Sequence, residues 1–142
     1  MNASKTTHQI ARRRMAALLL ITAFAGSTSP LQASLRPLFD ALREVESGGD
    51  PDVVGDGGRS IGPYQIQWKY WRDANLPGSY KDVRNPAYAE KVMVAYWQRH
   101  CPAALAREDY ATLARVHNGG PDGARNPATA CYWRKVSRAL RK

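Results

Sequence analysis

The apolar residues of segment 35–45 recur at intervals of three and four, the pattern of a helix with one face in a core. This stripe consists of Leu35, Leu38, Phe39, Leu42 and Val45. At about 100° per residue, Glu46 falls in the middle of the stripe, whereas Glu44 falls on the opposite face. Gly48 and Gly49 end the predicted helix, because glycine accepts the left-handed conformation that closes a last turn. The pattern therefore aims the carboxyl group of Glu46 at the core.

A small, irregular hairpin is predicted after this helix. Residues 50–62 are rich in glycine and aspartate and include two β-branched valines, with Gly57-Gly58 as the predicted turn. The aromatic-rich segment 64–72 is predicted to form a short helix, in which at least half of the aromatic side chains serve the core.

Three further helices are predicted from caps and apolar stripes. One opens at Asn85-Pro86 and runs towards His100, and the next runs over residues 110–118 and ends at Gly119-Gly120. The last opens at Asn126-Pro127 and carries an apolar stripe of Trp133, Val136 and Leu140. The pattern as a whole predicts a mainly helical α+β domain of about five helices and one hairpin.

The first 33 residues have the composition of an export signal. A basic stretch without acidic residues, formed by Lys5, Arg12, Arg13 and Arg14, precedes an apolar run over residues 15–25. This run is too short to span a bilayer comfortably. Cleavage after Ala33 or after Ala25 fits the small-residue rule, and we place the signal at residues 1–33 and the domain at 34–142. We expect an exported protein, periplasmic or secreted, without a membrane segment in its mature form.

Charge narrows the choice of partner only slightly. Residues 34–142 carry 17 basic and 12 acidic side chains, a net charge of +5. In an exported protein this excess suits an anionic polymer such as a cell-wall glycan at least as well as nucleic acid. The basic residues are scattered and form no nucleic-acid-binding module, so we expect no nucleic-acid partner.

The two cysteines, Cys101 and Cys131, are predicted to form one disulfide, since the compartment is oxidising and their number is even. The loop of about 30 residues would contribute roughly 3–4 kcal/mol. No Cys/His zinc pattern is present. The run that begins at Asp50 resembles a calcium loop, but Val54 and Ile61 occupy positions where the loop needs oxygen ligands. We expect no metal or cofactor.

Glu46 is the first candidate for chemistry. Burial disfavours the charged form of a carboxylic acid, and an acid that keeps its proton near neutral pH can act as a proton donor. The alternative is a structural glutamate, hydrogen-bonded at the helix end or left in water. The apolar stripe alone favours neither interpretation.

Three segments together resemble the lysozyme superfamily, specifically the invertebrate-type (destabilase-like) lysozymes and their small bacterial relatives. They are Val45-Glu46-Ser47-Gly48-Gly49, residues 56–66 with Gly62-Pro63-Tyr64-Gln65-Ile66, and residues 114–121 with His117-Asn118-Gly119-Gly120. The Tyr132-Trp133 pair also fits, and the resemblance spans residues 38–136. It implies a lysozyme-like fold with the hairpin beside the active-site cleft.

The resemblance also implies an activity and a set of site residues. Glu46 corresponds to the family's general acid and Asp56 to its second carboxylate, the pair that cleaves the β-1,4 bond between N-acetylmuramic acid and N-acetylglucosamine. Asp50 and Asp52 are rivals for the second role but match nothing in the motif. Substrate-binding positions carried over in the same way are Ser60, Tyr64, Gln65, His117, Asn118 and Gly119.

Two departures from the family limit this transfer. Invertebrate-type lysozymes contain many disulfides, whereas this chain has two cysteines. Some members also carry an isopeptidase activity attributed to a serine and to a lysine after Gln-Ile. Here Gln67 holds that position and Lys69 is displaced, so we do not expect the second activity.

Two other functions remain as alternatives. The same motifs resemble those of soluble lytic transglycosylases, which use one glutamate and release a 1,6-anhydro sugar. Asp56 favours the hydrolase. A non-catalytic peptidoglycan-binding domain is the alternative of another class, against which the intact Glu46 argues. We expect a monomer that acts on peptidoglycan strands.

Overall fold

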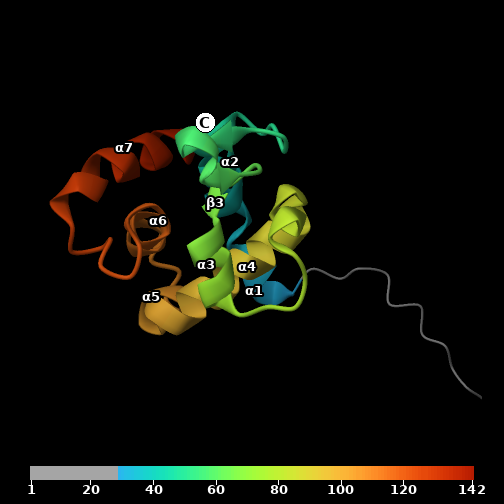
Figure 1. The fold of residues 1–142 in the computed structure, drawn as a ribbon. Coiled ribbons are helices and arrows are strands. Elements are labelled where there is room, and N and C mark those ends of the chain that lie inside the picture. Colours follow the sequence, from blue (N-terminus) through green and yellow to red (C-terminus); the bar gives the residue numbers. More distant parts are fainter. Residues whose placement is uncertain (1–28) are drawn as a thin grey trace, which may run out of the picture.

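Helices dominate the computed structural model, which describes residues 29–142 (Figure 1). Seven α-helices occur in this part of the chain: α1 (Pro30–Ser34), α2 (Arg36–Ser47), α3 (Trp68–Ala74), α4 (Pro86–His100), α5 (Pro102–Ala106), α6 (Tyr110–Gly119) and α7 (Ala130–Ala139). Three short strands form one sheet: β1 (Val54–Gly55), β2 (Ser60–Ile61) and β3 (Ile66–Gln67). The 3-10 turns are η1 (Asp56–Gly58), η2 (Tyr80–Arg84) and η3 (Pro127–Thr129). This is the mainly helical α+β fold that the sequence predicts.

Helix α2 confirms the first apolar stripe. Leu38, Phe39 and Leu42 are fully buried on one side of the helix. The helix ends at Gly48, whose φ of +63° is the left-handed conformation that glycine adopts without steric cost. Glu46 therefore occupies the last turn of α2, next to the buried stripe.

Helix α4 is the centre of the core. Its Trp97 is fully buried and stacks on Phe39 of α2, with ring centroids 5.9 Å apart. The indole Nε1 of Trp97 donates a hydrogen bond to the carbonyl oxygen of Leu113 in α6, at 3.0 Å. Asn85 caps α4 as predicted, since its side chain accepts from the backbone N–H of Tyr88. One helix thus joins the N-terminal and C-terminal halves of the described fold.

The sheet confirms the hairpin and extends it. Strands β1, β2 and β3 pair antiparallel in that order, with Val54 opposite Ile61 and Ile61 opposite Ile66. Gly57 lies in the turn with a φ of +65°, as the sequence predicts. The helix predicted over residues 64–72 is wrong in its first part, because Gln65 has a φ of +47° and β3 follows it. The third strand, β3, lies within the aromatic-rich segment 64–72, whose composition did not predict a strand.

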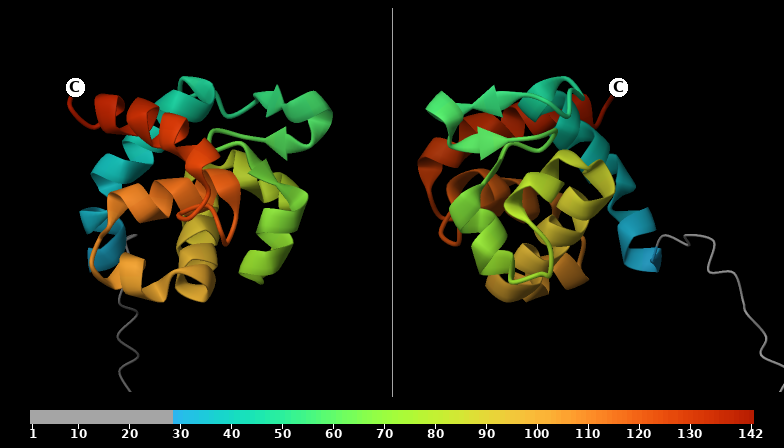
Figure 2. Two further views of the ribbon diagram at one scale, coloured as in Figure 1. Left: turned by 90° about the vertical axis from the view of Figure 1, so that its left-hand side faces the viewer. Right: turned by 45° about the vertical axis from the view of Figure 1, so that its right-hand side comes forward.

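Helix α7 completes the fold by packing on α2 and α6. Figure 2 shows α7, α2 and the strands on the same side of the molecule. Val136 is buried, and the apolar neighbours that pack beside it are Tyr132, Trp133, Ala139 and Leu140. Asn126 caps η3 instead of the helix itself, so α7 begins a few residues later than predicted. This packing brings α7 against the last turn of α2, where Glu46 lies.

The predicted disulfide between Cys101 and Cys131 is not formed, and both thiols are free. Cys101 is half-buried at the end of α4, whereas Cys131 is exposed in the first turn of α7 beside Arg134. An even number of cysteines does not specify a distance between them, and side-chain packing on α2 and α6 holds α7 in place instead. Burial raises the pKa of the Cys101 thiol to about 11.

The predicted signal falls mostly on residues 1–28, outside the described residues. Helix α1 begins just after them, and Leu31 packs against the core. In residues 29–142 every helix is too short or too polar to cross a bilayer.

Candidate active site

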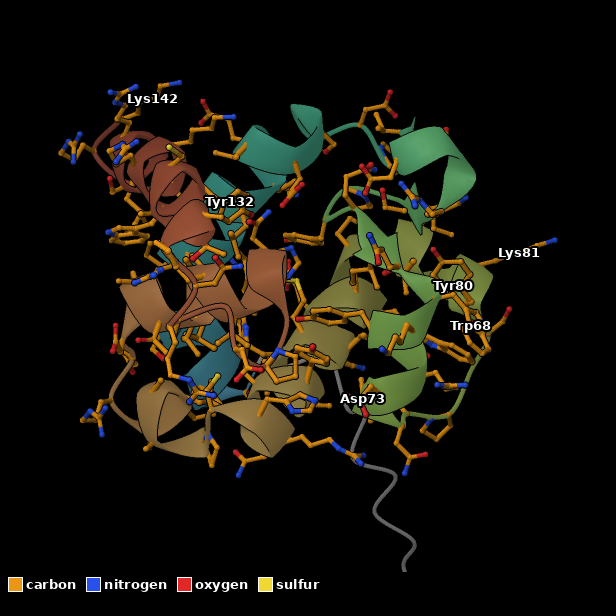
Figure 3. All side chains as sticks on the ribbon, turned by 60° about the vertical axis from the view of Figure 1, so that its left-hand side comes forward. Trp68, Asp73, Tyr80, Lys81, Tyr132 and Lys142 are labelled. Carbon is orange, nitrogen blue, oxygen red and sulfur yellow. The ribbon has the colours of Figure 1, made fainter. Side chains whose placement is uncertain are left out.

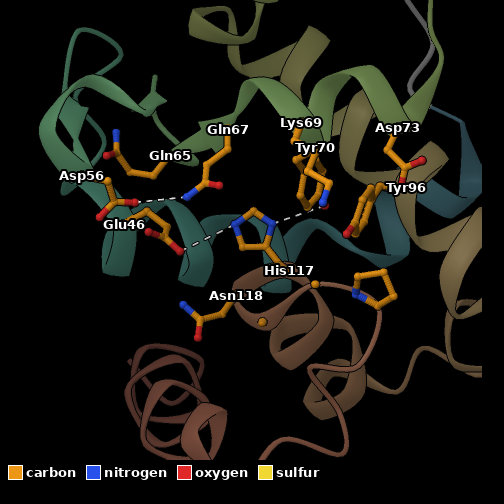
Figure 4. Close-up of a pocket in the computed structure, with 13 residues that line it drawn as sticks. Glu46, Asp56, Gln65, Gln67, Lys69, Tyr70, Asp73, Tyr96, His117 and Asn118 are labelled. Atoms are coloured by element: carbon orange, nitrogen blue, oxygen red, sulfur yellow. Dashed lines mark hydrogen bonds and ion pairs between the residues drawn. The ribbon is translucent and has the colours of Figure 1, made fainter.

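A cleft of about 430 Å³ opens between the sheet and the helices (Figure 4). One end is lined by Glu46 from α2 and by Asp56, Gln65 and Gln67 from the hairpin and β3. The other end is lined by residues of α3 and α4, and one side by the end of α6 and the turn after it. The two carboxyl groups proposed from the sequence thus line the same cleft from different elements.

Glu46 lies against Tyr132 and His117. Its Oε1 atom accepts a hydrogen bond of 2.5 Å from the hydroxyl of Tyr132 and lies 3.6 Å from Nε2 of His117. The side chain is 17% exposed, so it faces the cleft and is shielded on its other sides. Among the described residues, no lysine or arginine forms an ion pair with it. The carboxyl group is therefore fixed in position without a permanent positive charge beside it.

His117 links Glu46 to the backbone of the Gly62–Gln65 turn. Its Nε2 lies 3.2 Å from the carbonyl oxygen of Tyr64, and its Nδ1 lies 3.4 Å from the hydroxyl of Tyr70. A carbonyl oxygen only accepts, so Nε2 carries a hydrogen, and Nδ1 then accepts from the tyrosine in the neutral ring. The N–H that faces Tyr64 also faces Glu46. The histidine is thus oriented as a donor towards the carboxyl group.

Tyr132 was not among the predicted site residues. Burial, and then the negative charge of Glu46, raises the pKa of this hydroxyl far above its ordinary value. It therefore keeps its proton and donates to Glu46 at any physiological pH. Helical spacing could have indicated that Tyr132 faces the core, since it lies four residues before buried Val136 on the same face of α7. The sequence did not indicate which carboxyl group it meets.

Asp56 lies on the turn of the hairpin in a more open setting. The residue is exposed and has a φ of +51°, which aspartate tolerates better than most residues. Its Oδ2 atom lies 3.3 Å from the hydroxyl of Ser60 and 3.3 Å from Nε2 of Gln67 (Figure 4). Neutral donors therefore orient this carboxylate while water solvates it.

Two residues predicted to bind substrate are buried instead. Tyr64 is fully buried and donates its hydroxyl to Glu90, so only its backbone reaches the site, through His117. Ser60 is 2% exposed and lies between Asp56 and Gln65. Neither side chain lines the cleft in this structure, and a role of these two residues in substrate binding stays a prediction.

The remaining predicted residues do line the cleft. Gln65 lines the cleft, and its side-chain amide donates hydrogen bonds to the carbonyl oxygens of Val53 and Gly62. These two bonds hold the hairpin in its observed shape. Asn118 and Gly119 are exposed at the end of α6 and free to meet a ligand. Their role in binding stays a prediction.

The far end of the cleft was missed by sequence reasoning. Tyr70 stacks on Tyr96 with ring centroids 3.7 Å apart, and Asp73 pairs with His100 and, at 3.5 Å, with Arg99. Lys69 also lines the cleft and is its one lysine or arginine among the described residues. Lys69, Tyr70 and Asp73 come from one face of α3, so a prediction that began this helix at Trp68 would have grouped them, whereas Tyr96, Arg99 and His100 come from α4.

The two other aspartates considered for the second role, Asp50 and Asp52, do not line the cleft. Asp50 and Asp52 are exposed outside the cleft, and Asp52 lies 3.4 Å from Arg84. Residues 29–142 contain no group of three or more His, Cys, Asp or Glu side chains that could hold a metal ion.

Sequence comparison identifies similar proteins. The chain is 39% identical over 79 residues to a lysozyme of Magallana gigas and 37% identical over 99 residues to Lysozyme 1 of Crassostrea virginica. These matches cover 54% and 65% of this chain and 58% and 52% of the two relatives, so the chain spans little more than half of their length.

Solved structures agree with the sequence matches. The crystal structure of Tapes japonica lysozyme matches with a TM-score of 0.65 at 28% identity, over 72% of this chain and 88% of that one. Meretrix lusoria lysozyme, solved in complex with Aeromonas hydrophila PliI, matches with a TM-score of 0.63 over the same shares. Residues 38–139 match the family described as Destabilase, so this chain belongs to the destabilase family.

Proposed function

We propose that the protein is a lysozyme that hydrolyses the β-1,4 bond between N-acetylmuramic acid and N-acetylglucosamine in peptidoglycan. The observation that carries this proposal is a pair of carboxyl groups in unlike surroundings within one cleft. Glu46 is largely shielded, whereas Asp56 is exposed. Glycoside hydrolysis uses such a pair, one carboxyl group as acid and the other as nucleophile or base. The relatives named lysozyme support the same activity.

In this proposal Glu46 protonates the leaving glycosidic oxygen. The hydroxyl of Tyr132 holds the carboxyl group in place before the transfer, and Nε2 of His117 lies 3.6 Å from the same oxygen. After the transfer both donors point at the new carboxylate and stabilise its charge. Neither partner is a competing base for the proton in this arrangement, since the tyrosine keeps its own proton and the histidine presents an N–H.

Asp56 stabilises the positive charge that develops on the sugar ring in the transition state. Its exposure leaves the carboxylate open to water, and Gln67 and Ser60 fix its direction. The side chain either attacks the anomeric carbon or activates a water molecule, depending on its separation from Glu46 in the complex. Either route needs an ionised residue at this position.

Lys69 suits a substrate that carries carboxylates. It lines the cleft, is exposed, and forms no ion pair within residues 29–142. N-acetylmuramic acid carries a lactyl carboxylate or its peptide extension, whereas a chitin chain is uncharged. A free cation in the cleft thus favours peptidoglycan strands among the possible glycans.

A lytic transglycosylase is the second candidate, because it would use Glu46 in the same position and the same substrate. It would need no second carboxylate, since the sugar's own hydroxyl closes the 1,6-anhydro ring. The placement of Asp56 in the cleft favours hydrolysis over this route. Gln67 takes the position of the lysine used by the isopeptidases of the family, and it donates to Asp56 instead. We therefore propose no isopeptidase activity.

The deciding experiment is mass spectrometry of the muropeptides released from purified peptidoglycan by the full chain. Reducing ends support the lysozyme, anhydro ends support the transglycosylase, and no released product would support a binding domain only. Asp56→Asn should lower hydrolysis at least a hundredfold, because the amide neither attacks nor activates water. Asp52→Asn is the matched control, since Asp52 lies outside the cleft and should leave hydrolysis unchanged. Full activity of Asp56→Asn with anhydro products would reject the first candidate.

We also propose export, with removal of the N-terminal segment after Ala25. The contacts of α1 support this site over Ala33. Leu31 packs against the core. Cleavage after Ala33 would remove Leu31. The intact mass of protein recovered from the periplasm or medium should fit a chain that begins at residue 26, and a chain that begins at residue 34 would contradict the choice. A monomer by light scattering is expected.

A further inference from the structure

The positive charge of the described chain is concentrated on one element. Residues 29–142 contain 17 lysine and arginine residues and 12 aspartate and glutamate residues. Residues 130–142, which comprise α7 and the turn after it, hold five of the basic residues and none of the acidic ones. Residues 29–129 consequently contain 12 basic and 12 acidic side chains and have no net charge. The net charge of +5 is a property of α7 and its closing turn.

Four of these five cations have no carboxylate partner. Arg134, Lys135, Arg138 and Arg141 are all exposed, and within the described residues none of them forms an ion pair. Lys142 differs, because it pairs with Glu44 of α2. We refer to Arg134, Lys135, Arg138 and Arg141 as the α7 cationic face. Unpaired cations this close together repel one another, and an anionic ligand would relieve that repulsion.

The geometry of α7 gathers these side chains on one side. At about 100° per residue, Arg134, Lys135 and Arg138 fall within an arc of roughly 100°, and Arg141 follows three residues later in the closing turn. The apolar side of the helix is buried against α2 and α6. Figure 3 shows Tyr132 near the body of the molecule and Lys142 at its outer edge. The cationic face therefore points away from the side of α7 that holds Glu46.

We propose that the α7 cationic face is a docking surface for a linear polyanion rich in phosphate groups. Charge complementarity identifies the partner, because a row of arginine and lysine side chains along one helix matches a row of phosphates along a chain. Arginine supplies three of the four cations and binds phosphate oxygens with two parallel N–H donors. A polymer bound here leaves the cleft open. The proposal goes beyond the activity proposed above and does not depend on it.

The surface fits a polymer better than a bilayer or a nucleic acid. A helix that lies in a membrane interface inserts tryptophan, phenylalanine or leucine beside its cations. Val54 and Trp68 are the exposed large apolar residues of the described chain, and neither belongs to α7. Aromatic platforms on which bases could stack are missing from the cationic face for the same reason. The α7 cationic face can therefore bind a ligand through electrostatic contacts with phosphate groups.

The test is binding of the full chain to fluorescently labelled linear inorganic polyphosphate, measured by anisotropy over a series of NaCl concentrations. The expected slope of log K against log salt concentration is about −3, since each neutralised phosphate on a single flexible chain contributes about −0.7. Changing Arg134, Lys135, Arg138 and Arg141 to glutamine should weaken binding at least tenfold and flatten the slope. Wild-type affinity in this variant would overturn the proposal.

A second variant controls for net charge. Arg72, Lys81, Lys91 and Arg107 are exposed, unpaired within the described residues and spread over other elements. Their change to glutamine removes the same four charges and should weaken binding less than threefold. An equal loss in both variants would mean that net charge acts alone and would overturn the assignment to α7.

Two further arms complete the design. If the fourfold α7 variant does not fold, two double variants replace it: Arg134→Gln with Arg138→Gln, and Lys135→Gln with Arg141→Gln. Each should weaken binding about threefold, and unchanged binding in both would overturn the proposal.

Phosphatidylglycerol vesicles at equal phosphate concentration should bind more weakly than polyphosphate. Tighter binding to the vesicles would replace the polymer by a membrane surface.

Discussion

Two glutamates of this protein are both shielded from water, yet their partners differ. Glu90 of α4 is 4% exposed and accepts two hydrogen bonds from the guanidinium of Arg36, at 2.8 and 2.6 Å, and one of 2.7 Å from the hydroxyl of Tyr64. Glu46 of α2 is 17% exposed in its side chain, and its partners are the hydroxyl of Tyr132 and the imidazole of His117.

The difference separates a structural carboxylate, Glu90, from Glu46, which is proposed as the acid. Arg36 lies beside Glu90 as a permanent counter-charge, and the hydrogen bond to Glu90 raises the pKa of that guanidinium even above its ordinary value. Burial, and then the hydrogen bond to Glu90, raises the pKa of Tyr64 far above its ordinary value, so the tyrosine keeps its proton and the guanidinium of Arg36 keeps its charge. Glu46 has no fixed positive charge beside it. Its position is set by the hydrogen bond from Tyr132, which a carboxyl oxygen can accept both with and without its proton.

The largest expected effect tests Glu46 itself. Glu46→Gln should lower glycan cleavage by roughly 10²- to 10⁴-fold, because the amide keeps the shape of the side chain but has no proton to donate as an acid. The free energy of unfolding should change little. Turnover is measured by muropeptide release, with Glu44→Gln on the opposite face of α2 as control. Turnover near that of the wild type in folded Glu46→Gln would contradict the assignment.

The next effect tests Glu90. Glu90→Gln should lower the free energy of unfolding by about 2–3 kcal/mol, since Arg36 and Tyr64 lose a charged acceptor. The value lies below the roughly 3–5 kcal/mol of a fully buried pair, because the side chain of Arg36 is 40% exposed. Urea unfolding measures the change, and Glu108→Gln at an exposed site is the control. Turnover per folded molecule should fall far less than in Glu46→Gln, and a loss of equal size would erase the distinction between the two residues.

A smaller effect is expected at Tyr132. Tyr132→Phe removes the hydroxyl that donates to Glu46, and a hydrogen bond to a charged group is worth about 1.5 kcal/mol, or roughly tenfold in rate. Tyr110→Phe removes a hydroxyl that bonds the carbonyl oxygen of Ser34 outside the cleft, so its turnover should stay unchanged. Equal turnover in the two variants would show that the hydroxyl of Tyr132 does not support the acid.

The smallest effect concerns the two thiols, where burial and exposure are again compared. Burial raises the pKa of Cys101 to about 11, so at pH 8 almost all of it is the unreactive thiol. Cys131 is exposed and should be alkylated first by iodoacetamide. The rate at Cys101 should keep rising as the pH approaches about 11, because the thiolate fraction rises with pH. Peptide mass spectrometry follows both sites without reductant, and a recovered Cys101–Cys131 disulfide would contradict two free thiols.

The sequence by itself determined the features that depend on near neighbours in the chain. The stripe from Leu35 to Val45 placed Glu46 beside the core, Gly48 ended α2, Gly57 formed the hairpin turn, and Asn85 capped α4. Each of these follows from a few consecutive residues, because helix periodicity, caps and turns are set by local backbone geometry.

Only the tertiary structure decided which distant side chains meet. Tyr132 reaches Glu46 across 86 residues, Tyr64 turns into the core towards Glu90, and Lys69 comes to line the cleft. The predicted disulfide was wrong for the same reason, since the number of cysteines carries no information on the distance between them. These contacts depend on how α7 packs on α2 and how the sheet packs on α3, and that packing is a property of the whole core.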